Sequence, residues 1–291
     1  MQLIYFTKFL KGLSPEQIAE TATTLGVDGL DLAIRAGQCV NPSNIREALP
    51  KAMAVWRKSN VVVPLATLEG GAIDPSRSEI ETIFAACAEQ GIANIKLGYW
   101  LWKETDWPGA RMKYWKAVDL IRVALGRFEI LSEKYGIRSL VHTHCDNYYA
   151  VNASAARHLV SGFDSRHVGL YLDPAHLSLN GEILPMAIDI CGEYLHMIAA
   201  KSVRWKLSSE TAPGKPAEWK HDWCGLSEGL INWPAALRSL HAAGYAGPIS
   251  VHGEYSGPEI TADILKRVSA DVAFLRAHAV APPVHSMAQG V

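Results

Sequence analysis

The sequence predicts a single domain, a (β/α)₈ TIM barrel, over residues 1–278. In a recurring local pattern, a helix ends at glycine and a strand begins within about five residues, the usual length of such a connection. This pattern occurs four times, at Gly26, Gly91, Gly136 and Gly244. In addition, eight candidate strands alternate with eight candidate helices, which suits a chain of 291 residues. An open doubly wound sheet is the runner-up, but no Gly-x-Gly-x-x-Gly sequence follows the first strand.

The predicted elements follow one another in regular alternation. The strands are expected near residues 2–6, 29–33, 61–68, 94–99, 138–143, 168–173, 195–201 and 248–253. The helices are expected near residues 15–25, 43–58, 76–90, 111–135, 153–161, 184–193, 233–243 and 259–278. The first helix has the clearest start, because Ser14 can cap it, proline suits the next position and Gln17 completes a capping box.

Two segments depart from this alternation. Residues 204–232 look like an extended loop that carries Trp205 and Trp223 and leaves the C-terminal end of the seventh strand. We interpret it as a lid; the alternatives are an ordered surface loop that covers no site and a contact in a dimer. A second aromatic stretch, around Trp100, follows the fourth strand, and aromatic side chains at the rim of a pocket suit stacking against sugar rings. The tail 279–291 has no periodicity and is predicted to be flexible.

Composition excludes several classes of protein. The formal net charge of −1 gives no basic face for nucleic acid. The chain has no apolar run of eighteen residues and no signal peptide, so no membrane association is expected. Its five cysteines are scattered, which is typical of reduced thiols and favours a cytoplasmic location. The oligomeric state stays open, a homo-oligomer included.

Polar side chains gather at the ends of five predicted strands. They are Glu69, His142, His144, Asp173, His176, Lys201, His252 and Glu254. Because the C-terminal ends of barrel strands converge on one mouth, these residues are expected to surround one concave site. Side chains alternate along a strand, so His142 shares a face with His144, and His252 with Glu254. A single histidine of this kind is more often a core residue, but polar residues at five ends favour a functional site.

Two kinds of chemistry suit this group. Imidazole and carboxylate ligands can hold a divalent metal such as Mn²⁺, Mg²⁺, Zn²⁺ or Co²⁺, which would polarise a carbonyl while a carboxylate removes the adjacent proton. Alternatively, Lys201 supplies the positive charge without a metal. Lys201 could also form a Schiff base, the least favoured of these readings.

Taken together, these motifs resemble a known family over about residues 1–278. They are Leu25-Gly26-Val27-Asp28-Gly29-Leu30-Asp31-Leu32, Val141-His142-Thr143-His144, Leu172-Asp173-Pro174-Ala175-His176, Ala200-Lys201-Ser202, Leu226-Ser227-Glu228-Gly229 and Gly247-Pro248-Ile249-Ser250-Val251-His252-Gly253-Glu254-Tyr255. The chain is similar to the xylose-isomerase-like TIM barrels, which include sugar epimerases, inosose dehydratases and the endonuclease IV group. The order and spacing of the motifs indicate the superfamily and not one reaction.

The chain departs from the metal site that the resemblance implies. In the epimerases a glutamate commonly occupies the place of His142, another the place of His252, and a histidine lies near Ala199; only Asp173 is unchanged. The resemblance therefore implies a divalent metal on His142, Asp173 and His252, with Glu254 as a further candidate ligand and loss of the metal as the alternative.

The resemblance also suggests roles for the other residues. Glu254 is the candidate general base, or else an anchor for the loop that follows it, and Lys201, His144 and Glu69 complete the candidate catalytic set. His144 and His176 correspond to positions that contact substrate hydroxyls. The candidate substrate-binding residues are His176, Trp100, Trp205, Trp223 and Glu228, of which Glu228 either caps a loop or reaches the pocket.

The expected function is an enzyme that acts on a sugar or polyol by removing a proton next to a carbonyl. The outcome would be isomerisation or epimerisation, or β-elimination by a lyase or dehydratase. A catalytically silent sugar-binding protein on the same barrel is the alternative from another class. A metal-dependent endonuclease is disfavoured, because that group needs more ligands and a positively charged surface.

Overall fold

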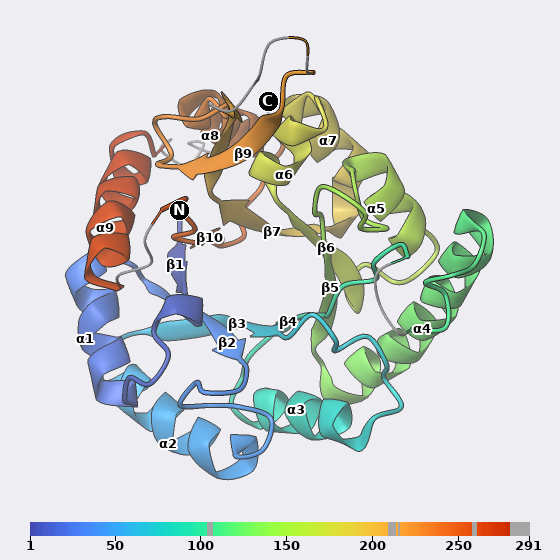
Figure 1. Ribbon diagram of the computed structural model, residues 1–291. Helices are drawn as coiled ribbons and strands as arrows, with labels where there is room; N and C mark the ends of the chain where they lie inside the picture. Colours follow the sequence, from blue (N-terminus) through green and yellow to red (C-terminus); the bar gives the residue numbers. More distant parts are fainter. Residues whose placement is uncertain (104–106, 209–213, 215, 258–260, 280–291) are drawn as a thin grey trace, which may run out of the picture.

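The computed structural model describes residues 1–291 except 104–106, 209–213, 215, 258–260 and 280–291. Eight parallel strands form a closed barrel in the order β1-β10-β7-β6-β5-β4-β3-β2 (Figure 1). Helices surround the barrel on its outside, as predicted for a single TIM barrel. Within the described residues, no helix is both long and apolar enough to span a membrane.

All eight predicted strands and eight predicted helices are present. The barrel strands are β1 (Leu3–Phe6), β2 (Gly29–Ile34), β3 (Val62–Leu68), β4 (Asn94–Lys96), β5 (Arg138–His142), β6 (Val168–Leu172), β7 (Leu195–Ala200) and β10 (Ile249–Val251). The predicted helices are α1 (Pro15–Leu25), α2 (Ile45–Lys58), α3 (Ser78–Glu89), α4 (Tyr114–Tyr135), α5 (Ala153–Val160), α7 (Leu184–Cys191), α8 (Trp233–Ala242) and α9 (Thr261–Ala277).

Local sequence explains where these elements begin and end. The Ser14 side chain accepts a hydrogen bond from the Gln17 amide, and the Gln17 side chain accepts one from the Ser14 amide, so the predicted capping box is formed. Gly26 ends α1 with φ of 70°, a left-handed conformation that glycine adopts without steric cost. Because helices cover the outside and side chains fill the inside, strands such as β1 and β6 are buried along their whole length.

The expectation of a plain loop over residues 204–232 is wrong. An antiparallel hairpin of β8 (Ser202–Leu207) and β9 (Trp219–Cys224) occupies much of it. Cross-strand pairs stabilise the hairpin, including an Arg204–Asp222 ion pair with Nε and Oδ2 2.7 Å apart. Arg204, Trp205, Lys206 and Leu207 do alternate between charged and apolar side chains, a pattern typical of a strand, although all four are exposed.

Other differences are smaller. A short helix, α6 (Pro174–Leu179), was not predicted; Asp173 caps it by accepting hydrogen bonds from the amides of Ala175 and His176. Two 3₁₀ turns, η1 (Thr7–Phe9) and η2 (Gly192–Tyr194), complete the set. The proposed lid falls partly on residues 209–213 and 215, and the predicted flexible tail almost entirely on 280–291, outside the described residues.

Candidate active site

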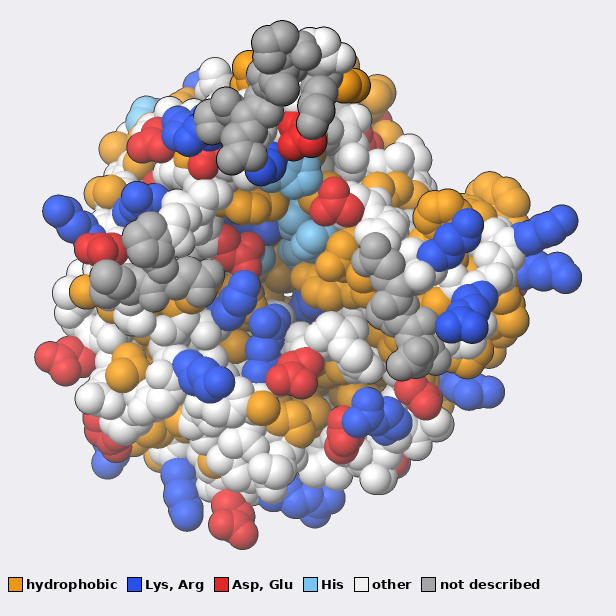
Figure 2. Space-filling model, viewed as in Figure 1, with side chains coloured by type: hydrophobic (Ala, Val, Ile, Leu, Met, Phe, Trp, Pro, Cys, Tyr) orange, Lys and Arg blue, Asp and Glu red, His pale blue; other side chains and the backbone are white. Residues whose placement is uncertain are grey.

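A cavity of about 150 Å³ opens at the mouth of the barrel. Basic, acidic and histidine side chains meet in the hollow at the centre of the view in Figure 2. The charged residues that line the cavity are Lys8, Asp31, Arg35, Lys96, Lys201 and Glu254. Three histidines, His142, His144 and His252, line it as well. The predicted convergence of strand ends therefore brings together five of the predicted residues: Lys201, Glu254 and the three histidines.

A chain of alternating charges crosses one side of this cavity. Glu254 accepts hydrogen bonds from the ammonium groups of Lys8 and Lys201, each 2.9 Å from a carboxylate oxygen. The Lys201 Nζ also lies 3.4 Å from Oδ2 of Asp173, which is fully buried. Two lysines and two carboxylates thus balance one another, which allows the charges to persist in a partly buried site.

These contacts shift the pKa values of the charged residues. Burial acts to lower the pKa of Lys201, but the carboxylates of Asp173 and Glu254 outweigh it and raise that pKa, so Lys201 is an ammonium ion. Burial acts to raise the pKa of Glu254, but Lys201, His252 and Lys8 hold it well below its usual value. Burial raises the pKa of Asp173 to about 6 despite its proximity to Lys201. A Schiff base on Lys201 is therefore disfavoured, since it needs a neutral amine.

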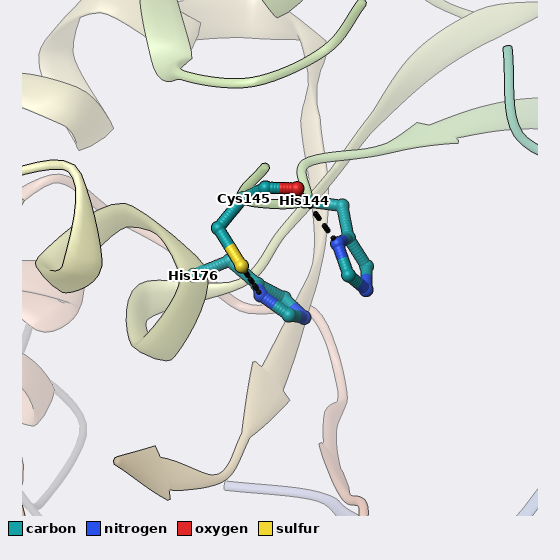
Figure 3. A group of neighbouring side chains, drawn as sticks. All are labelled: His144, Cys145 and His176. Atoms are coloured by element: carbon teal, nitrogen blue, oxygen red, sulfur yellow. Dashed lines mark hydrogen bonds between the residues drawn. The ribbon is translucent and has the colours of Figure 1, made fainter. Parts of the chain in front are cut away.

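The hydrogen bonds of His176 fix its tautomer. The Lys201 ammonium can only donate, so Nε2 of His176, 2.7 Å away, accepts and Nδ1 carries the proton. Nδ1 points at the Cys145 sulfur, 3.0 Å away (Figure 3). His144 stacks on His176 with ring centroids 3.6 Å apart, and its Nδ1 donates to the Cys145 carbonyl oxygen. The lone pair of His144 then lies on Nε2, and burial lowers the pKa of this residue to about 4, so the ring is neutral.

Two groups of side chains in the described residues have the spacing of metal ligands, with ligand atoms within 4.8 Å of one another. They are His144, Cys145 and His176, and Cys145, Asp146 and His221. Hydrogen bonds already use several of these atoms: Nδ1 of His176 carries a proton, and the Cys145 thiol donates to Asp146 at 3.2 Å. A metal would have to displace the protons from both atoms. These contacts favour a hydrogen-bonded cluster.

The residues expected to hold a metal have a different geometry. The His142 Nε2 and Asp173 Oδ2 are 3.6 Å apart, buried, and without another hydrogen-bond partner among the described residues. His252 instead has its Nε2 2.7 Å from the Tyr171 hydroxyl. Mg²⁺ and Mn²⁺ prefer oxygen ligands, and here Asp173 and Glu254 both contact the Lys201 ammonium. The three residues therefore do not fit a hard divalent ion.

A buried network that the sequence did not suggest lies at the base of the cavity. Asp31, on β2, accepts hydrogen bonds from Thr67, from Ser250 at 2.9 Å and from Tyr171 at 3.1 Å. Because the Tyr171 hydroxyl donates to Asp31, His252 must donate from Nε2 to the tyrosine oxygen. Burial raises the pKa of Asp31 to about 6. The signal in the sequence was a carboxylate inside an otherwise apolar strand, Gly29-Leu30-Asp31-Leu32.

The other predicted residues have varied positions. Trp223 and His176 border a second hollow beside the cavity, and the Trp223 ring lies 4.4 Å from the Lys201 Nζ. Trp100 is buried in the core, and Trp205 is 43% exposed with its ring against His221. Glu69 is exposed and accepts a hydrogen bond from the Ala36 amide, and Glu228 is exposed near Arg204. Among the described residues, these last four do not line the central cavity.

Comparison with known proteins agrees with this architecture. A family model described as a xylose isomerase-like TIM barrel matches residues 11–278. Among curated proteins, none matches this sequence.

Solved structures show the same fold at low identity. The 3-keto-D-glucoside 4-epimerase of E. coli superimposes with a TM-score of 0.70 at 16% identity, covering 95% of this chain and 99% of that one. The probable 3-DHS dehydratase of Bacillus anthracis gives 0.68 at 14% identity, covering 95% and 99%. A xylose isomerase-like TIM barrel protein of Mycobacterium smegmatis, solved in complex with magnesium, gives 0.65 at 13% identity, covering 96% and 98%.

Proposed function

Because the chain belongs to the xylose isomerase-like TIM barrel family, we propose that it is an enzyme acting on a small sugar or polyol. The reaction would begin with removal of a proton from the carbon next to a carbonyl. Isomerisation, epimerisation and β-elimination all share this first step, and structural neighbours named as an epimerase and a probable dehydratase are compatible with each. The observation that carries the proposal is the contact of an ionised carboxylate, Glu254, with the Lys201 ammonium inside the cavity.

The two residues would act in complementary ways. Glu254 is ionised in its surroundings, so it can accept the proton from the substrate carbon. Lys201 directs two of its hydrogens to His176 and Glu254, at 2.7 and 2.9 Å, while its contact with Asp173 is longer, at 3.4 Å. The third hydrogen can therefore turn to a substrate oxygen and stabilise the negative charge that develops there.

Neighbouring side chains would orient the substrate. The free Nε2 lone pair of His144 can accept a hydrogen bond from a substrate hydroxyl. Cys145 holds both His144 and His176 through its carbonyl oxygen and its sulfur (Figure 3). The two stacked rings thereby stay beside Lys201. Trp223 offers an aromatic face next to the lysine.

One observation favours a second candidate, a sugar-binding protein without catalysis. Two lysines hold the pKa of Glu254 well below its usual value, which weakens it as a base. Deuterium exchange decides between the two candidates. We expect that a 3-keto sugar, ketohexose or inosose incubated with the protein in D₂O gains deuterium at a carbon next to its carbonyl, as followed by NMR. Binding of such sugars without exchange would favour the silent protein.

The positive charge at the site could come from Lys201 or from a metal. A zinc-type ion, which accepts imidazole ligands, is the alternative, because His142 Nε2 and Asp173 Oδ2 have no hydrogen-bond partner among the described residues; when bound, it would polarise the substrate carbonyl. Because the Lys201 ammonium lies 3.4 Å from the same Asp173 oxygen, we propose the lysine as the source.

Metal analysis tests this choice. We expect protein purified without chelator to carry less than about 0.1 equivalent of metal, on the order of trace contamination, and to keep its melting temperature when Mn²⁺, Mg²⁺, Zn²⁺ or Co²⁺ is added. A stoichiometric metal in the wild type that is lost in Asp173→Asn would contradict the lysine proposal and assign the charge to an ion on His142 and Asp173.

A further inference from the structure

Two basic residues of the cavity, Lys96 and Arg35, each have a buried nitrogen without a hydrogen-bonding partner in the part of the chain that the structure describes. Lys96 ends β4, is 1% exposed, and its Nζ contacts no acceptor among the described residues. Arg35 follows β2, and its Nε is likewise buried and without a partner. Both residues line the central cavity, whereas the other two cations there, Lys8 and Lys201, are paired with Glu254.

Aromatic rings hold these two cations in place. The Lys96 Nζ lies 3.3 Å from the centroid of the Tyr99 ring, and the Arg35 guanidinium lies 5.1 Å from that of Phe6. An aromatic face takes up only the N–H groups that point at it, so the other N–H groups stay available. Burial and the nearby Arg35 lower the pKa of Lys96, which an anionic ligand would offset. Burying a cation without a counter-charge costs free energy, and groups of this kind are found mostly at functional sites.

We propose that Lys96 and Arg35 bind the carboxylate of the substrate, so that the enzyme acts on a sugar acid. This inference rests on the proposed function for the reaction, but the binding step can be tested without it. The planar fork of an arginine matches the two oxygens of a carboxylate, and a lysine adds a second, charge-assisted hydrogen bond. Both side chains face one small cavity, which limits the ligand to a small molecule.

Charge balance favours a carboxylate over a phosphate. Lys8 and Lys201 are balanced by Glu254 and Asp173. Of the other ionisable groups that line the cavity, Arg35 and the ammonium form of Lys96 exceed Asp31 by one positive charge. Burial holds the pKa of Lys96 well below its usual value, and a bound anion would restore the ammonium form. A carboxylate supplies one negative charge, whereas a phosphate monoester carries about −1.5 to −2 at neutral pH. Glu254 lines the same cavity as Lys96, so the bound carboxylate and the proposed base would lie in one site.

Calorimetry with defined ligands tests the proposal. The panel contains the acids D-gluconate, 2-keto-D-gluconate and D-glucuronate, the neutral sugars D-glucose and D-fructose, and D-glucose 6-phosphate. We expect at least one acid to bind about 30-fold or more tightly than the neutral sugars and the phosphate, the scale of a buried charge pair. Lys96→Met should weaken the binding of that acid by a similar factor. Failure of every acid, or tighter binding of the phosphate, would overturn the proposal.

Thermal stability supplies a second readout that a structural role of Lys96 would not give. Lys96→Met removes an unpaired buried cation and keeps the length of the side chain, so the melting temperature of the free protein should rise. Lys8→Met is the matched control, because it removes a cavity cation whose charge Glu254 already balances; it should not raise the melting temperature and should weaken the acid less. A fall in melting temperature for Lys96→Met with unchanged acid affinity would assign Lys96 to the core.

The outcomes separate this inference from the proposed reaction. Binding of an acid without deuterium exchange would support the anion site and contradict the proposed reaction. Deuterium exchange on a neutral sugar, at a rate that is the same in Lys96→Met, would support the proposed reaction and overturn the anion site. Trapping of a substrate carbonyl on Lys96 by borohydride, located by peptide mass spectrometry, would also overturn it, since Lys96 would then be a nucleophile.

Discussion

Replacing Glu254 by glutamine should lower kcat by about 10²-fold to 10⁴-fold, the usual contribution of acid–base catalysis. Glutamine keeps the shape of the side chain and can still accept a hydrogen bond from Lys8 or Lys201, but it cannot take a proton from carbon. Asp173 remains beside Lys201 in this variant, so the lysine keeps a counter-charge. We therefore expect KM and the melting temperature to change much less than kcat.

The matched control is Glu69→Gln. Glu69 is the other carboxylate among the candidate catalytic residues, but it is exposed and accepts a hydrogen bond from the Ala36 amide. We expect this variant to keep near-wild-type kcat. Both variants are measured on a substrate that the wild type turns over. If Glu254→Gln keeps its activity, the base lies elsewhere in the cavity, at His144 or Asp31, and Glu254 serves to anchor the chain after β10.

Strand ends were the most informative feature of the sequence. In a closed parallel barrel every strand ends at the same rim, so a polar residue at a strand end is brought to the cavity whatever its partners are. This is why Lys201, His252 and Glu254, far in the chain from His142 and His144, could be grouped before any contact was known. Their hydrogen bonds depend on side-chain conformations, which strand periodicity does not determine.

The same reasoning does not place Glu69. Thr67 lies within β3 and lines the cavity. By alternation Glu69 should share that face, but its carboxylate accepts a hydrogen bond from the Ala36 amide and is exposed. Trp205 was placed by assuming a loop over the mouth, whereas the hairpin directs it against His221. Glu228 was placed from a family motif, and it lies near Arg204 outside the cavity lining.

Residues inside strands were missed for the opposite reason. Lys96 belongs to the short strand Asn94-Ile95-Lys96, where a lysine reads as the exposed end of a strand. Burial of a lysine contradicts the ordinary preference of this residue, so periodicity alone could not predict it. Asp31 was visible as part of a family motif, but its hydrogen bonds come from Thr67, Tyr171 and Ser250, on three other strands.

The second large effect is expected for Lys201→Met, which should destabilise the protein by about 3–5 kcal/mol near neutral pH, as loss of one partner of a buried ion pair does. The ammonium group contacts Asp173, Glu254 and His176, and Asp173 is fully buried. Without the lysine, the Asp173 carboxylate keeps hydrogen bonds from two backbone amides but loses the cation in contact with it. Urea denaturation of the two proteins measures the difference.

The destabilisation should depend on pH with a definite sign. The pKa of Asp173 is already raised to about 6 in the folded protein by burial, and loss of Lys201 removes a cation that lowers it. The folded variant therefore binds a proton at Asp173 more readily than the unfolded chain does, so its loss of stability should be largest at about pH 8 and smaller at about pH 5. Asp173→Asn in the same variant should recover part of the stability at pH 8, because the uncompensated charge is gone.

Lys8→Met is again the control, because Lys8 bonds the same glutamate but its side chain is 40% exposed. An exposed ion pair contributes about 0–1 kcal/mol, so this variant should lose little stability and show little pH dependence. Equal losses in the two variants would mean that Lys201 acts as an ordinary surface cation and that Asp173 is already protonated in the wild type. The lysine would then be a poor source of charge for the reaction. A metal would become the better explanation of why His142 Nε2 and Asp173 Oδ2 lack a hydrogen bond within the described residues.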